Sequence, residues 1–157
     1  MENKKDNPGV YIPPPLIYVA IFFAAVFIQK LVPISKDYFY TTSSTIIGVV
    51  ILIASLFFNL PSLLQFIKTK NTLITVKPAN SLQTKGIYSI SRNPMYVSLV
   101  FVYTGLSFLT GNWWNLILLP LLLLIVQEYI IKREEKYLER RFGQEYLNYK
   151  SKVKRWI

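Results

Sequence analysis

Four long apolar segments constrain the fold of this chain more strongly than any other feature of its sequence. They run from about residue 16 to 33, 46 to 67, 95 to 109 and 113 to 131. A membrane-spanning helix needs about 20 mainly apolar residues, so the second and fourth segments qualify, while the first and third need a tilt or interfacial residues at their ends. We therefore predict an all-α integral membrane protein in which about four transmembrane helices form a single domain over residues 1–157.

The residue types that are absent narrow the possible chemistry. The 157-residue chain contains no cysteine and no histidine. Disulfides, thiol nucleophiles, imidazole bases and zinc sites built from Cys and His are therefore excluded. Any catalysis must rest on carboxylates, Arg, Lys, Tyr, Ser, Thr and backbone groups, and we expect no bound metal.

The chain carries a net charge of +10, and the position of these charges matters more than their total. Residues 68–92 hold five basic and no acidic side chains, and residues 132–157 hold nine basic and four acidic ones, whereas residues 110–115 are uncharged. Basic loops stay on the cytosolic side of a membrane, so we predict that both termini and the 68–92 loop are cytosolic. In a prokaryote this membrane would be the cell (inner) membrane. The basic excess indicates anionic membrane lipids as partners and not nucleic acid, because the sequence contains no soluble basic module.

The sequence SRNPMY, residues 91–96, stands directly before the third apolar segment. Asn93 and Pro94 are suited to the N-cap and the first position of a helix. Tyr96 would then lie one turn further along, at the depth of the lipid headgroups. This stretch alone leaves two interpretations open: a helix start with a positive-inside arginine, or part of a site that uses Arg92.

The segment after residue 131 continues the fourth apolar segment as a charged helix. On helical spacing, one face of this helix combines Leu124, Gln127, Ile131, Glu134, Leu138 and Phe142. Glu134 thus takes a place where an apolar residue is expected, and Glu135 lies beside it. Glu128 and Lys132 form a favourable i,i+4 pair, which accounts for solvent-facing charge but not for Glu134. A carboxylate on an apolar face at a membrane boundary needs a partner and is a candidate functional residue.

Several short motifs occur together in the second half of the chain. In order, they are Gly86-Ile87-Tyr88, Arg92-Asn93-Pro94-Met95-Tyr96, Glu134-Glu135, Leu138, Phe142-Gly143, Tyr146, Tyr149, Val153 and Arg155-Trp156. Together they resemble the isoprenylcysteine carboxyl methyltransferase family, which is related to the phospholipid N-methyltransferases. The resemblance covers about residues 73–157, and the order of the motifs against the predicted membrane helices makes it specific.

The resemblance implies an integral-membrane enzyme that uses S-adenosylmethionine as methyl donor and a lipid or lipid-modified molecule as lipophilic acceptor. It implies a cytosolic-side pocket covered by the 68–92 loop and the C-terminal segment, with residues 73–157 as the cofactor-binding core. The residues that it assigns to cofactor binding are Tyr88, Arg92, Asn93, Pro94, Tyr96, Glu134 and Glu135. Many relatives have histidine where Asn93 stands, and asparagine can form hydrogen bonds but cannot accept a proton as a base.

The chemical character of these residues suggests roles within the implied pocket. Arg92 is suited to hold the carboxylate of the cofactor through charge-assisted hydrogen bonds. Glu134 or Glu135 is suited to accept from its ribose hydroxyls or to favour its cationic end. Tyr88 and Tyr96 are suited to pack near the adenine or the sulfonium.

Two acceptor chemistries remain open from the sequence. A carboxylate acceptor needs a cation to hold it, and Arg155 is suited to this catalytic role. An amine acceptor must instead lose a proton, and Glu134 or Glu135 can act as the base that accepts it. Because the resemblance extends through Tyr149 and Arg155, we expect isoprenylcysteine-type carboxyl O-methylation, with phospholipid amine N-methylation as the alternative. A third hypothesis is a non-catalytic membrane scaffold, which would not bind S-adenosylmethionine.

Overall fold

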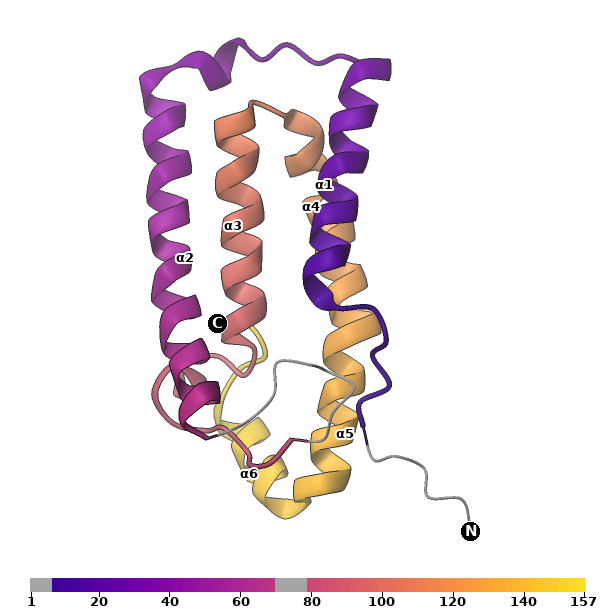
Figure 1. Cartoon of the computed structure of the whole chain (residues 1–157), viewed down its shortest axis with the longest axis vertical. Coiled ribbons are helices and arrows are strands. Elements are labelled where there is room, and N and C mark those ends of the chain that lie inside the picture. Colours follow the sequence, from indigo (N-terminus) through magenta and orange to yellow (C-terminus); the bar gives the residue numbers. More distant parts are fainter. Residues whose placement is uncertain (1–6, 70–78) are drawn as a thin grey trace.

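The structure is a computed structural model that describes residues 7–69 and 79–157, and the regular elements within these ranges are all helical. The α-helices are α1 (Pro14–Leu31), α2 (Thr42–Lys68), α3 (Pro94–Thr110), α4 (Trp113–Ile125), α5 (Lys132–Phe142) and α6 (Gln144–Lys152). Shorter turns in the described chain are η1 (Asp37–Tyr40) and η2 (Gly86–Ser89), which are 3₁₀-helical, and η3 (Val126–Ile131), which is π-helical. Figure 1 shows α1 to α4 side by side as an elongated bundle, with α5 and α6 at one end of it.

The described helices have the length and composition of membrane helices. Three stretches are long and apolar enough to cross a membrane, namely Pro14–Leu31, Thr42–Lys68 and the continuous run Trp113–Phe142. Helix α3 is also apolar but has only 17 residues. Large apolar side chains such as Phe23 and Ile53 are 64% and 62% exposed, as expected for lipid-facing residues. The predicted all-α membrane architecture with about four helices is confirmed, and each predicted segment overlaps one of them.

Helices α2 and α3 approach each other through two glycines, in a contact that we call the α2–α3 seam. A Cβ atom on Gly105 would lie 2.7 Å from Cγ of Leu52 and 2.9 Å from the carbonyl oxygen of Gly48. Further small residues that are buried on these two helices are Ser44, Ser55, Ser62, Ser98 and Ser107. Small residues allow close backbone contact in a membrane, where lipid tails leave little hydrophobic attraction between helices. The seam therefore holds α3 at a fixed position against α2.

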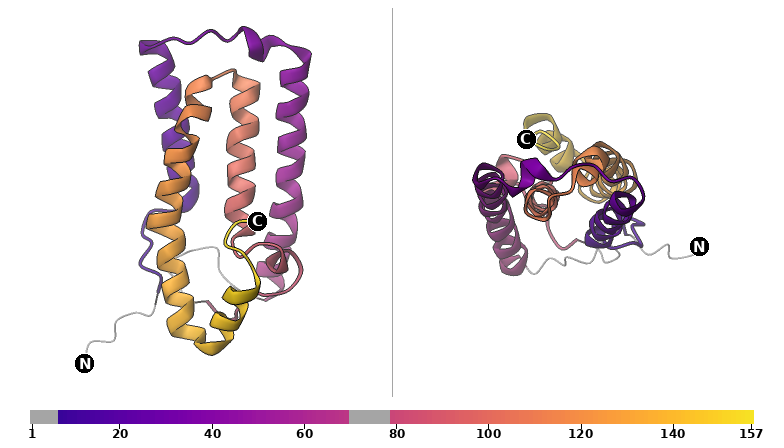
Figure 2. Two further views of the ribbon diagram at one scale, coloured as in Figure 1. Left: turned by 180° about the vertical axis from the view of Figure 1, so that it is seen from behind. Right: turned by 90° about the horizontal axis from the view of Figure 1, so that it is seen from above.

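The core of the bundle lies on the other side of α3, where α1, α4 and η3 meet it. In the end-on view of Figure 2, α3 lies between α2 and the pair formed by α1 and α4. The buried cluster includes Tyr18, Tyr96, Tyr103, Leu122 and Val126. Because Tyr96 belongs both to this cluster and to the first turn of α3, the core holds that turn in place.

The run from α4 through η3 to α5 is continuous, as predicted, but it differs from the prediction in two ways. It ends at Phe142, because Gly143 adopts φ +51° and α6 starts in a new direction. The π-helical turn also rotates the residues that follow it relative to an unbroken α-helix. The predicted stripe put Leu124 and Glu134 on one face, but Leu124 is 56% exposed, and Glu135 is only 6% exposed.

Candidate active site

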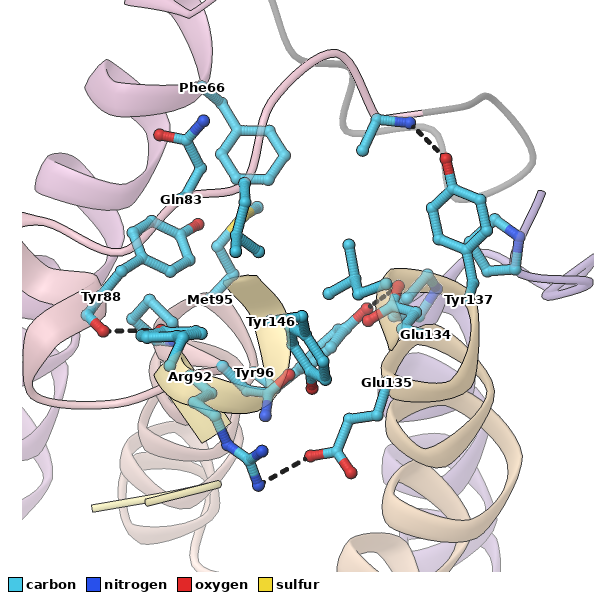
Figure 3. A pocket seen from close by; sticks show the side chains of 18 of the residues that line it. Phe66, Gln83, Tyr88, Arg92, Met95, Tyr96, Glu134, Glu135, Tyr137 and Tyr146 are labelled. Atoms are coloured by element: carbon cyan, nitrogen blue, oxygen red, sulfur yellow. Dashed lines mark hydrogen bonds and ion pairs between the residues drawn. The ribbon is translucent and has the colours of Figure 1, made fainter. Parts of the chain in front are cut away.

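A cavity of about 460 Å³ lies at the end of the bundle that carries α5 and α6. Its walls come from the first turns of α1 and α3, the last turns of α2, the chain between α2 and α3, and helices α5 and α6 (Figure 3). Pro14, Leu63 and Leu99 line it from the membrane helices, while Arg92 and Glu134 line it from the charged segments. A mainly apolar cavity of this size with a few polar groups is typical of small-molecule sites.

The start of α3 is fastened to the C-terminal segment. Helix α3 begins at Pro94, as predicted, but the Asn93 side chain does not cap it. Asn93 Nδ2 instead donates to the backbone oxygen of Arg155 at 2.9 Å, across 62 residues of sequence. The backbone N–H of Arg92 likewise donates to the backbone oxygen of Lys154 at 3.0 Å. Asn93 therefore takes the predicted N-cap position, but its side-chain amide binds this distant carbonyl instead of capping the helix.

Glu134 connects α5 to α3 at the cavity. The hydroxyl of Tyr96 donates to Oε1 of Glu134 at 2.8 Å. Helix α5 is too rich in charged residues to lie in the hydrocarbon of a membrane, so Glu134 lies beyond the spanning part of its helix. Burial raises the pKa of Glu134 to about 7, with the hydrogen bond from Tyr96 opposing the rise and the charge of Glu135 adding to it. Near neutral pH this carboxyl can therefore both hold and release a proton.

Glu135 is shared by two arginines, and we call these three side chains the ion triad. Nε and Nη2 of Arg155 donate to Oε1 and Oε2 of Glu135 at 2.9 and 2.8 Å. Nη2 of Arg92 lies 3.0 Å from Oε1 of Glu135, and these two side chains are each 8% exposed. Within the described part of the chain, Nε and Nη1 of Arg92 are buried without a hydrogen-bond partner. Buried donors on a charged group are costly to leave unpaired, so these nitrogens are candidate donors to an anionic ligand.

Two tyrosines tie distant segments together around the cavity. The hydroxyl of Tyr137 in α5 accepts a hydrogen bond from the backbone N–H of Ala79 at 2.8 Å. The hydroxyl of Tyr149 in α6 donates to the backbone oxygen of Tyr88 at 2.6 Å. Burial raises the pKa of the Tyr88 and Tyr149 hydroxyls above their usual range, so both groups stay protonated. The chain before α3 is thus held against both helices of the charged end.

The predicted site residues come together, with one difference. The residues predicted to bind the cofactor all line the cavity, namely Tyr88, Arg92, Asn93, Pro94, Tyr96, Glu134 and Glu135. Arg155, which was predicted to hold the acceptor, is not among the residues that line it and pairs with Glu135 instead. Their individual roles stay predictions.

Further polar residues line the cavity without having been assigned to it from the sequence, among them Tyr137, Asn59 and Gln83. Tyr137 follows Glu134 by three residues, so helical spacing was a usable signal for it. Asn59 was visible as a polar residue inside an apolar segment, and its Nδ2 donates to Oγ of Ser98 at 3.2 Å. Gln83 lies in a segment without periodicity, and no sequence pattern pointed to it.

Comparison with protein families supplies an independent assignment. A family model described as phospholipid methyltransferase matches residues 43–145, a range that holds α3, α4, α5 and most of the cavity. The chain belongs to the phospholipid methyltransferase family. The predicted relationship to isoprenylcysteine carboxyl methyltransferases and their phospholipid-methylating relatives is confirmed.

Two relatives of this member of the phospholipid methyltransferase family each match only part of its chain. An uncharacterized protein of Haemophilus influenzae is 39% identical over 66 residues, which cover 40% of this chain and 100% of that protein. The protein-S-isoprenylcysteine O-methyltransferase of Schizosaccharomyces pombe is 38% identical over 72 residues, which cover 46% of this chain. The chain matches only 30% of the length of that enzyme. No solved structure matches the chain.

Family membership and the membrane helices together define the class of the protein. The chain is a membrane protein of the phospholipid methyltransferase family, and its family and relatives indicate a methyltransferase. Over residues 7–69 and 79–157, no group of three or more His, Cys, Asp or Glu side chains is placed to hold a metal ion. The ionisable side chains that line the cavity are those of Arg92, the two glutamates and the surrounding tyrosines.

Proposed function

We propose that this chain transfers the methyl group of S-adenosylmethionine to a lipophilic acceptor bound in the cavity. The observation that carries the proposal is the pair of buried donors on Arg92, Nε and Nη1, which have no partner among the described residues. The carboxylate of S-adenosylmethionine is a suitable partner for these donors. When bound, this cofactor supplies a methyl group that its sulfonium has already activated. The task left to the protein is to align donor and acceptor and to exclude water.

The residues of the cavity fit this cofactor. Tyr88 and Tyr146 line the cavity together with Arg92 and offer aromatic surface to an adenine ring or a sulfonium. Arg155 already donates to both oxygens of Glu135. We therefore assign the contact with the ribose or with the cationic end of the cofactor to Glu134, whose remaining hydrogen-bonding capacity is larger.

We propose that the acceptor enters the cavity sideways from the membrane. The residues that line the cavity from the membrane helices include Pro14 and Pro15 of α1, Leu63 and Phe66 of α2, and Leu99 of α3. These groups suit a hydrocarbon chain, because apolar surface dominates most ligand sites and a few polar groups orient the ligand. The polar head of such an acceptor would then meet Glu134 and Tyr96.

The acceptor predicted from the sequence is a carboxylate held by Arg155, and an amine is the second candidate. A specific observation favours the amine. Arg92 is the single cationic side chain among the described residues that line the cavity, and Glu134 and Glu135 line it as well. Once the cofactor carboxylate takes Arg92, an acceptor carboxylate would face Glu134 without a cation to hold it. An amine would instead find in Glu134, with its pKa of about 7, a group able to accept its proton.

Transfer of labelled methyl groups into lipids tests the proposed function. Purified protein in detergent should bind S-adenosylmethionine in calorimetry and should transfer its labelled methyl group to a component of a membrane lipid extract. The chemical stability of the product then distinguishes an ester from a methylated amine, because only the ester is cleaved by mild base. A protein that binds no S-adenosylmethionine would instead support the scaffold hypothesis.

We further propose that the cavity lies on the cytosolic side, in the cell membrane if the source is prokaryotic. The basic residues concentrate in the segments at the cavity end of the bundle, which supports a cytosolic position for the cavity. Because the native chain has no cysteine, single substitutions can be labelled without background. In intact cells, Ser43→Cys at the opposite end should react with an impermeant reagent and Ser81→Cys at the cavity should not. The reverse pattern would overturn the orientation.

A further inference from the structure

We propose that Arg155 is a positioning residue, which occupies Glu135 so that Nε and Nη1 of Arg92 stay unpaired and can donate to the carboxylate of the cofactor. This inference rests on the proposed function, and it gives Arg155 a different task from the acceptor binding expected from the sequence. It assigns to Arg155 an indirect influence on a ligand that its own side chain does not contact.

The hydrogen bonds of the ion triad are divided unequally between the two arginines. Arg155 makes a bidentate contact with Glu135 through Nε and Nη2, whereas Arg92 reaches Glu135 through Nη2 alone. Bidentate arginine–carboxylate pairs are the strongest and most directional of the ion pairs. The plane of the Glu135 carboxylate is therefore set by Arg155, and Arg92 retains two buried donors without a partner in the described chain.

The charges of the triad point to the same conclusion. Two guanidinium groups and one carboxylate leave one positive charge, at a place where both Arg92 and Glu135 are 8% exposed. If the Arg155 side chain were absent, Glu135 could turn both oxygens toward Arg92 and form the bidentate pair there. Arg92 would then be neutralised, and one of its two unpaired donors would no longer be available to an incoming carboxylate.

The backbone of Arg155 is held independently of its side chain. Its carbonyl oxygen accepts from Nδ2 of Asn93 at 2.9 Å and from Oγ of Ser91 at 3.4 Å. The preceding carbonyl, of Lys154, accepts from the backbone N–H of Arg92. These contacts survive when the side chain of Arg155 is truncated, so its electrostatic role can be tested while the C-terminal segment stays in place.

The test compares two ligands that differ in the carboxylate. S-adenosylhomocysteine carries the amino-acid carboxylate of the cofactor, and 5′-methylthioadenosine lacks it. Calorimetry on detergent-purified full-length protein would measure both affinities for the wild type, Arg155→Ala, Glu135→Gln and the double variant. Thermal unfolding of each variant would show whether it is folded, and Arg155→Lys replaces Arg155→Ala if the latter is not, because lysine cannot form the bidentate contact.

We expect Arg155→Ala to weaken S-adenosylhomocysteine binding by about tenfold or more, the effect of losing a hydrogen bond to a charged group. Binding of 5′-methylthioadenosine should stay unchanged. Adding Glu135→Gln to Arg155→Ala should restore most of the lost affinity, because a neutral amide cannot neutralise Arg92. A purely structural role of Arg155 predicts equal losses for both ligands and no restoration, and either result would overturn the inference. A wild-type protein that binds neither ligand would instead overturn the proposed function together with this inference.

Discussion

The α2–α3 seam and the cavity lie along the same helix and are built in opposite ways. In the seam, a single methyl group on Gly105 would come within 2.7 Å of Leu52 and 2.9 Å of the Gly48 carbonyl. In the cavity, about 460 Å³ is left between the side chains, and two nitrogens of Arg92 have no partner among the described residues. The comparison shows how this small chain separates stability from ligand binding. Tight contact between α2 and α3 holds the first turn of α3, so that the site beside it can be left open.

The largest effect is expected in the seam itself. Gly105→Leu should prevent the chain from folding, because the added atoms would meet the backbone of α2, which cannot move aside. The measurement is the yield and the size-exclusion profile of the protein in detergent. The matched control is Leu106→Phe at the exposed neighbouring position, which should leave both unchanged. Normal folding of Gly105→Leu would show that the seam is not the rigid part of the bundle.

The next effect concerns proton transfer in the cavity. If the acceptor is an amine, kcat/KM should rise as pH increases through about 7, because Glu134 loses its proton there and becomes a base. Glu134→Gln should remove this rise and lower kcat/KM by about 10²- to 10⁴-fold, the usual contribution of general base catalysis. A carboxylate acceptor is ionised throughout the range from about pH 6 to 9. A pH-independent rate that Glu134→Gln leaves unchanged would therefore favour carboxyl O-methylation.

A smaller effect is expected for binding at Arg92. Arg92→Ala should weaken S-adenosylmethionine binding by about 10- to 100-fold, because it removes hydrogen bonds from a charged donor. Calorimetry measures this loss directly. The matched control is Arg133→Ala on the same side of the protein, since Arg133 contacts Gly9 and Tyr129 and does not line the cavity. Equal losses for both variants would mean that general charge, and not the unpaired donors of Arg92, attracts the cofactor.

The smallest effect is expected where the seam and the cavity meet. Asn59 lines the cavity and donates to Oγ of Ser98 across the seam at 3.2 Å. Asn59→Ala should lower the free energy of unfolding by about 0.6 kcal/mol, the average for hydrogen bonds between membrane helices. Denaturation in detergent measures this change, and calorimetry should show unchanged affinity for S-adenosylmethionine. A large loss of affinity would instead place Asn59 in the binding site.

The sequence was sufficient to predict the helices, because apolar runs of membrane length leave a chain few alternatives. The predicted segment from about 46 to 67 corresponds to α2 (Thr42–Lys68), and the one from about 95 to 109 to α3 (Pro94–Thr110). It was also sufficient to name part of the cavity lining, including Arg92 and Glu134, since the motifs occur at the ends of those helices. Both predictions depend on patterns that are local in the sequence.

The contacts within the site depend on geometry that has no local pattern. The pairing of Glu135 with Arg155 requires the chain to turn at Gly143, whose φ of +51° brings α6 back toward the cavity. The hydrogen bond from Asn93 to the Arg155 backbone competes with helix capping, and the sequence alone favours the cap. The sequence VQEYII of the π-helical turn before α5 contains no pattern that marks the turn. For these reasons the sequence pointed to Glu134 as the unusual carboxylate but not to the shared position of Glu135.

The π-helical turn η3 (Val126–Ile131) gives the orientation of α5 an unusual origin. A turn of this kind amounts to one extra residue within an α-helix, and each residue of an α-helix advances the direction of the side chains by about 100°. Deleting a single codon from this stretch would therefore let the helix wind regularly and would turn Glu134 and Glu135 away from Tyr96 and Arg92. The apolar composition of the span would hardly change, and insertion into the membrane would proceed as before. The direction of the two carboxylates thus depends on the phase of the helix that carries them. The gain or loss of one codon in evolution can change this phase without altering the membrane helices.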